Sequence, residues 1–76
     1  MFREHVESFT AKHSPQHVID YVQEMLSSGQ STKEDFEKEV DRIQKKMDTG
    51  TKNTVEWLGD WSMRDYLREI LKFYKD

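Results

Sequence analysis

The clearest potential for metal chemistry lies in two histidines near the N-terminus. His13 and His17 are four residues apart, the spacing at which one helix presents two imidazoles to a single zinc ion. Pro15 lies between them, and the residue before a proline is pushed out of the α conformation, so helical ligand geometry does not follow. Asp20 and Glu24 come one and two turns after His17 and would add at most a weak carboxylate site. We therefore expect surface or capping histidines, with no metal and no other cofactor.

The sequence contains no recognisable set of catalytic groups. There is no cysteine, which excludes thiolate nucleophiles, disulfides and thiolate zinc sites. No serine, histidine and acid can be combined into a triad from their spacing, and the three glycines are too far apart to form a phosphate-binding loop. We expect a protein that is not an enzyme.

Aromatic and arginine side chains near the C-terminus have the composition of a protein-binding surface, because Trp, Tyr and Arg are enriched at the energetic centres of interfaces. The candidate partner-binding residues are Trp57, Trp61, Tyr66, Phe73, Arg64 and Arg68. The partner would be another protein, as for a regulator or inhibitor, or a second copy of the chain, since dimerisation can complete the core of a very small domain. The alternative is that these aromatic residues all belong to the chain's own core.

A helix-turn-helix regulator is the alternative from another functional class. Residues 15–48 predict two helices joined by "SSGQ", which is the order of elements in that motif. The second helix opens with acidic residues, which would repel DNA where its phosphates must approach. These acidic residues are Glu34, Asp35, Glu37 and Glu39. We therefore do not expect nucleic acid as the partner.

A basic stripe on the last predicted helix does not change this expectation. Its members are Arg64, Arg68, Lys72 and Lys75. Asp65 and Glu69 interrupt the stripe, so ordinary ion pairing explains it better than phosphate binding. The chain has 12 basic and 15 acidic residues, a net charge of -3, and thus lacks the basic face of a nucleic-acid-binding protein.

Length and composition limit the stability of the fold. A chain of 76 residues is at most one domain, here 1–76, and such a domain buries only about 60% of the surface that its unfolded chain exposes. Leu, Ile, Val and Phe number only 16, so we expect a stability on the order of 3–5 kcal/mol. No stretch approaches the roughly 18 apolar residues of a membrane span, and the charged N-terminus does not resemble a secretory signal. We expect a cytoplasmic protein that does not contact a membrane.

Apolar spacing predicts an all-α fold, a small four-helix bundle with a short N-terminal helix and three longer ones. Phe2, Val6 and Phe9 follow the i, i+4, i+7 spacing of one helix face. Ser14 as N-cap and Pro15 as the first helical residue are typical of the start of a second helix, which extends to residue 27.

The third helix is predicted over residues 31–48. Gly29 suits the left-handed position that ends the helix before it. A capping box fits this start in two ways, as Ser31 with Glu34 or, more loosely, as Thr32 with Asp35. The apolar seam of this helix is narrow, whereas the second and last helices have broad apolar faces, so we expect the two broad faces to pack together at the centre.

The stretch "EWLGDWSMRDYL", residues 56–67, determines how the two tryptophans are used. If one helix ran unbroken through Gly59, Trp57 and Trp61 would lie opposite the apolar face and would be exposed. We therefore expect a break at Gly59. Asn53 would cap a short turn before it, and Ser62 would cap the last helix after it.

With that break, Trp61 would lie just before the last helix and pack on Tyr66 as a hydrophobic staple. Trp57 would then be the more exposed residue and the better candidate for contact with a partner. A straight helix through Gly59 would reverse this assignment for both tryptophans.

Overall fold

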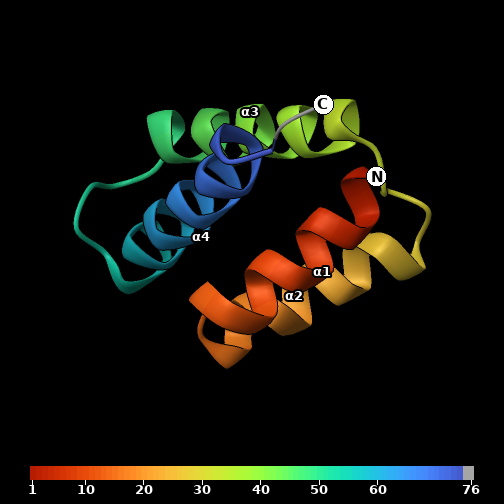
Figure 1. Cartoon of the computed structure of the whole chain (residues 1–76). Coiled ribbons are helices and arrows are strands. Elements are labelled where there is room, and N and C mark those ends of the chain that lie inside the picture. Colours follow the sequence, from red (N-terminus) through yellow and green to blue (C-terminus); the bar gives the residue numbers. More distant parts are fainter. Residues whose placement is uncertain (75–76) are drawn as a thin grey trace.

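Four α-helices joined by short loops make up the computed structural model, which describes residues 1–74 (Figure 1). The helices are α1 (Phe2–His13), α2 (Gln16–Ser27), α3 (Lys33–Thr49) and α4 (Val55–Lys72). α3 and α4 make the most extensive contacts, and α1 packs on both α2 and α4. The prediction of a small all-α bundle of four helices is confirmed.

The first helix and its junction with the second differ from the prediction. α1 is not shorter than α2, since each has 12 residues. α2 begins at Gln16 with Pro15 as its N-cap, so Ser14 does not cap it. Ser14 is extended, as expected for a residue before proline, and its N–H donates to the Thr10 carbonyl oxygen (3.2 Å) at the end of α1. The Ser14 hydroxyl oxygen is buried without a hydrogen-bond partner among residues 1–74.

The centre of the bundle is not the pair of broad faces that the sequence suggested. α4 packs along α3, the helix with the narrow seam, because the short loop 50–54 places these consecutive helices side by side (Figure 1). A narrow seam is sufficient for an antiparallel pair of this kind. All four seam residues of α3 are buried: Phe36, Val40, Ile43 and Met47.

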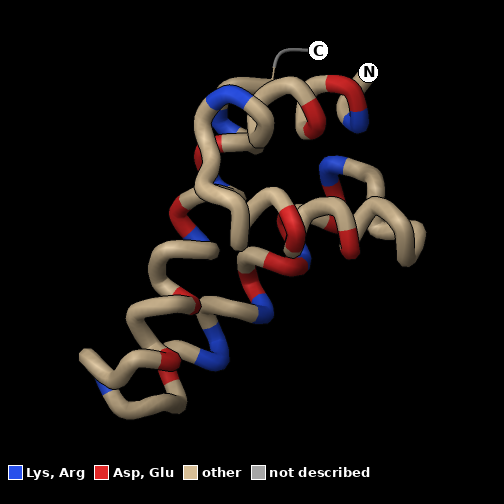
Figure 2. Tube along the Cα trace, turned by 90° about the horizontal axis from the view of Figure 1, so that it is seen from below, with Lys and Arg blue, Asp and Glu red and all other residues tan. Residues whose placement is uncertain are grey.

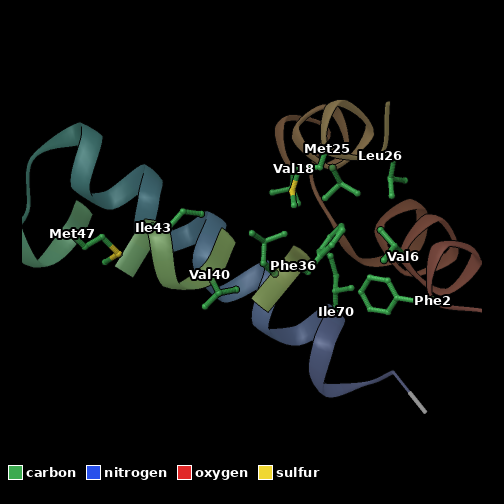
Figure 3. Packing of buried hydrophobic residues seen from close by; sticks show 12 residues of the cluster. Phe2, Val6, Val18, Met25, Leu26, Phe36, Val40, Ile43, Met47 and Ile70 are labelled. Carbon is green, nitrogen blue, oxygen red and sulfur yellow. The ribbon is translucent and has the colours of Figure 1, made fainter. Parts of the chain in front are cut away.

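Phe36 occupies the middle of the core. Its ring is fully buried and lies among Phe2 and Val6 of α1 and Ile70 of α4 (Figure 3). The Phe2 ring meets it edge to face, with centroids 5.2 Å apart. α2 completes this cluster with Val18, Val22, Met25 and Leu26. All four helices therefore contribute to one core.

The turn between α2 and α3 contains both predicted capping features. Gly29 has φ +92°, and the N–H groups of Gly29 and Gln30 donate back to carbonyl oxygens in the last turn of α2, which is the Schellman pattern. Of the two possible capping boxes, the looser one forms. The Asp35 N–H donates to Thr32 Oγ1 (3.1 Å), and the Thr32 N–H donates to Asp35 Oδ2 (3.2 Å).

α4 runs without a break through Gly59, so the predicted joint is wrong. Its N-cap is Thr54, whose hydroxyl oxygen accepts a hydrogen bond from the Trp57 N–H (3.1 Å). Asn53 lies in the preceding loop with φ +69°, and Ser62 lies inside the helix. The two residues predicted as caps therefore do not cap a helix.

Contacts with α3 explain why the helix continues. Glu56 and Asp60 lie on either side of Gly59, one turn apart, and both pair with the Lys46 ammonium group of α3, at 3.0 and 3.3 Å. Trp57 packs against the core from the same turn. A glycine inside a helix costs only about 1 kcal/mol relative to alanine, which these contacts outweigh.

Replacing Gly59 by alanine should therefore stabilise the protein. An added Cβ would meet nothing within 4 Å, and alanine should raise the free energy of unfolding by about 0.5–1 kcal/mol in a helix interior. Urea denaturation followed by circular dichroism measures the change. Gly29→Ala is the matched control and should destabilise the protein by about 1 kcal/mol, because its positive φ strains an L residue. A destabilised Gly59→Ala protein would contradict a continuous α4.

Candidate functional site

The outer face of α4 exposes a tryptophan. Trp61 retains 46% of its accessible surface, and Leu58, one turn earlier, is also exposed. Ile70 is fully buried and, at about 100° per residue, lies about 180° around the helix from Trp61. Trp61 therefore lies on the side of α4 that faces away from the core.

Trp57 and Trp61 have the opposite roles to those predicted with a break at Gly59. Trp57 is partly buried and packs against the core, whereas Trp61 lies within the helix and is not a staple before its start. The two positions are only about 40° apart around the continuous helix, so its direction alone does not separate them. Trp57 lies beside Thr49 and Gly50 at the end of α3 and packs against the core, so the expectation that an unbroken helix would expose both indoles is wrong for Trp57. Trp61 is therefore the better candidate for contact with a partner.

A hollow of about 400 Å³ lies beside Trp61, between α4 and the end of α1. We call it the α4 groove. It is open to solvent and combines aromatic rings with carboxylates. Its lining residues are His13, Trp61, Ser62, Asp65, Tyr66 and Glu69.

The two carboxylates of the groove differ in how far they are neutralised. Asp65 Oδ1 accepts a hydrogen bond from Arg64 Nη2 at 3.1 Å, while Asp65 Oδ2 has no hydrogen bond within residues 1–74. The Glu69 carboxylate has no hydrogen bond or ion pair with any residue in that range. Neither lysine nor arginine lines the groove, so it carries a net negative charge.

Arg64 has a structural position and is not free for a partner. Its side chain is only 14% exposed, and its Nη1 donates to the Gln44 side-chain oxygen of α3 at 2.6 Å. Together with the bond to Asp65, this contact fixes α4 on α3.

The remaining predicted residues of α4 are spread over its length. Tyr66 is partly buried and packs against the core. Phe73 is 52% exposed and stacks on Phe9 of α1, with ring centroids 5.8 Å apart. Arg68 is exposed and makes no ion pair with the described residues. The structure therefore brings Trp61 and Tyr66 together at the groove and places Phe73 apart from them, at the end of the helix.

Ion pairing explains the basic stripe only at Arg64. The Lys72 ammonium group lies 5.5 Å from the centroid of the Phe73 ring, where a cation–π contact is favourable. Lys75 lies outside the described residues.

An aromatic cluster around His5 was not predicted. The His5 Nε2 atom donates to the Ile70 carbonyl oxygen of α4 at 2.7 Å, and its ring lies 5.8 Å from Phe9 and 5.3 Å from Tyr74. The sequence signal for this position was the i, i+4 spacing of His5 and Phe9 on one face of α1. This histidine joins α1 to the end of α4.

A second polar cluster, of Tyr21, Glu39 and Arg42, joins α2 to α3. The Arg42 guanidinium donates to both carboxylate oxygens of Glu39, at 2.6 and 2.9 Å, and to the Tyr21 hydroxyl oxygen at 2.9 Å. The Tyr21 hydroxyl in turn donates to Glu39. Hydrogen bonding from Arg42 lowers the pKa of Glu39, whereas burial and the neighbouring Glu39 carboxylate raise the pKa of Tyr21.

Acid should weaken this cluster. Because the pKa of Glu39 is lower in the folded protein than its ordinary value of 4.5, its stabilising contribution is complete above about pH 4.5 and is lost as the pH falls through the folded pKa. Glu39→Gln should therefore reduce the fall in unfolding free energy between about pH 7 and pH 3, measured by urea denaturation. Glu37→Gln, at an exposed position without an ion pair in residues 1–74, should follow the wild-type pH profile. Equal profiles for Glu39→Gln and wild type would refute the role of Glu39.

No metal-binding cluster is found in residues 1–74, where no group of three or more His, Asp or Glu side chains could hold an ion. His13 and His17 lie on different helices, α1 and α2.

None of the helices described is long and apolar enough to cross a membrane.

No protein-family model, curated protein or solved structure matches this chain. The function is therefore inferred from the chemistry of the surface described above.

Proposed function

We propose that this chain is a non-enzymatic protein-binding module that docks through the outer face of α4. The observation that carries the proposal is the exposure of Trp61, an indole with 46% of its surface accessible on the side away from the core. Tryptophan is the residue type that most often dominates the energy of protein interfaces, because its large ring excludes water when a partner covers it.

The rigidity of α4 supports this choice of surface. Leu67 and Ile70 are fully buried on its inner side, and Arg64 ties it to Gln44 of α3. A side chain on a fixed helix loses little freedom on binding, so more of the contact energy remains as affinity. The Trp61 face is therefore suited to a partner that binds without rearranging the bundle.

A module of this size would act as a regulator or inhibitor of a larger protein, or would pair with a second copy through the same face. The distribution of charge supports a protein partner over nucleic acid. Acidic and basic residues are both present along the helices (Figure 2), and the first turn of α3 carries Glu34 and Asp35. A helix-turn-helix protein would need a basic face at that position.

Affinity capture from a cell lysate tests the proposal. We expect a protein retained by the wild type to be lost with Trp61→Ala and kept with Val55→Ala, an equally apolar position at the start of α4 that is 90% exposed. Capture of the same proteins by all three would rule out the Trp61 face. Salt-sensitive retention of the protein on heparin would instead favour the helix-turn-helix alternative.

A further inference from the structure

We infer that the α4 groove recognises an isolated lysine or arginine side chain of the partner, an inference that rests on the proposed protein-binding function. The groove combines an exposed indole, a tyrosine ring and two carboxylates within one hollow of about 400 Å³. Aromatic faces and carboxylates each attract a cation, so their combination selects for one.

The carboxylates give the groove its charge preference. Glu69 makes no ion pair within residues 1–74, and Asp65 is bonded to Arg64 through Oδ1 only. The Arg64 guanidinium points to Gln44 of α3 and does not line the groove. An incoming ammonium or guanidinium group can therefore bind Glu69 and Asp65 Oδ2 without breaking an existing bond.

The rings supply the second part of the site. Trp61 and Tyr66 line the hollow together with the two carboxylates. A long cationic side chain could lay its apolar stem along the indole and place its charge at Glu69, as lysine and arginine do at interfaces. Norleucine would keep the stem contact and lose the charge contact, while a glutamate would be repelled.

The surroundings of the groove argue against a run of basic residues. Arg68 and Lys72 lie on the same outer face of α4 but do not line the hollow. Their charges would repel further cations of a partner that covers this face. A single basic side chain flanked by neutral or acidic residues therefore fits better than a polybasic segment.

Matched synthetic peptides test the inference with the intact chain. Three dodecapeptides share one neutral scaffold of alanine and leucine and carry arginine, norleucine or glutamate at the central position. Titration is followed by the NMR signal of the Trp61 indole N–H. We expect the arginine peptide to bind about tenfold more tightly than the norleucine peptide, and the glutamate peptide to bind least.

Variants of the protein test how much the Glu69 carboxylate contributes to the preference for arginine. Glu69→Gln should reduce the preference for arginine to about threefold or less, since the unpaired charge is removed. Glu37→Gln is the matched control, because this exposed carboxylate of α3 has no ion pair within residues 1–74 and does not line the groove, and it should leave the preference unchanged. An effect of both variants alike would overturn the assignment of the charge preference to the groove.

The possible failures are distinguishable from failure of the proposed function. Equal binding of the arginine and norleucine peptides, or no shift of the Trp61 signal with any peptide, would overturn recognition of a basic side chain. The docking face itself would still be judged by capture with Trp61→Ala. A Trp61 signal that shifts with protein concentration alone would show a second copy in the groove and would also overturn the inference.

Discussion

Replacing Phe36 by alanine should unfold most of the protein at room temperature. The ring is fully buried at the centre of the core, where it meets Phe2 edge to face at 5.2 Å. Truncation of a buried phenylalanine costs about 3–5 kcal/mol, because the lost apolar contacts leave a cavity. That cost equals the whole stability expected for a chain of this length, on the order of 3–5 kcal/mol.

Circular dichroism of the Phe36→Ala protein, with thermal and urea denaturation, measures this effect. Phe73→Ala is the matched control, since the same substitution is made at a ring that is 52% exposed. It should cost about 1 kcal/mol or less, from the lost stacking on Phe9. Similar midpoints for the two variants would show that Phe36 is not the centre of the core.

The two tryptophans should respond very differently to the same truncation. Trp57→Ala should lower the free energy of unfolding by about 2 kcal/mol, roughly half the cost for a fully buried aromatic residue, because its ring packs against the core. Trp61→Ala should change stability by about 0.5 kcal/mol or less, as expected for a substitution on the outer face of a helix.

Urea denaturation of both single variants gives the comparison, with the Trp57→Phe protein as the conservative control that keeps an aromatic ring. Trp57→Phe should retain more than half of the stability that Trp57→Ala loses. A larger loss for Trp61→Ala than for Trp57→Ala would mean that the outer indole is structural. That result would also remove the basis for a docking surface on α4.

The helices could be predicted because their signals are local. The i, i+4, i+7 spacing of Phe36, Val40 and Ile43 identifies a buried seam, and these side chains are buried as predicted. The same is true of the turn between α2 and α3, where Gly29 and the Thr32 capping box act on the backbone next to them. Such features depend on a few neighbouring residues and are therefore visible in the order of the sequence.

The arrangement of the helices could not be predicted in the same way. The width of an apolar face does not indicate which helix will cover it. The short loop between α3 and α4 determined which helices pack together, more than the broad apolar faces of α2 and α4 did. Contacts between helices, such as the bonds of Arg42 to Tyr21, join residues far apart in the chain and leave no periodic pattern.

For the candidate site, Gly59 shows most clearly what local sequence rules cannot predict. Local rules correctly identify it as a weak point in a helix, but they do not include the pairing of Glu56 and Asp60 with Lys46 on another helix. Local sequence thus defined the helices, their seams and one capped turn. The path of α4 through Gly59, and with it the exposure of Trp61, depended on contacts with α3, because packing between helices outweighs a local preference of about 1 kcal/mol.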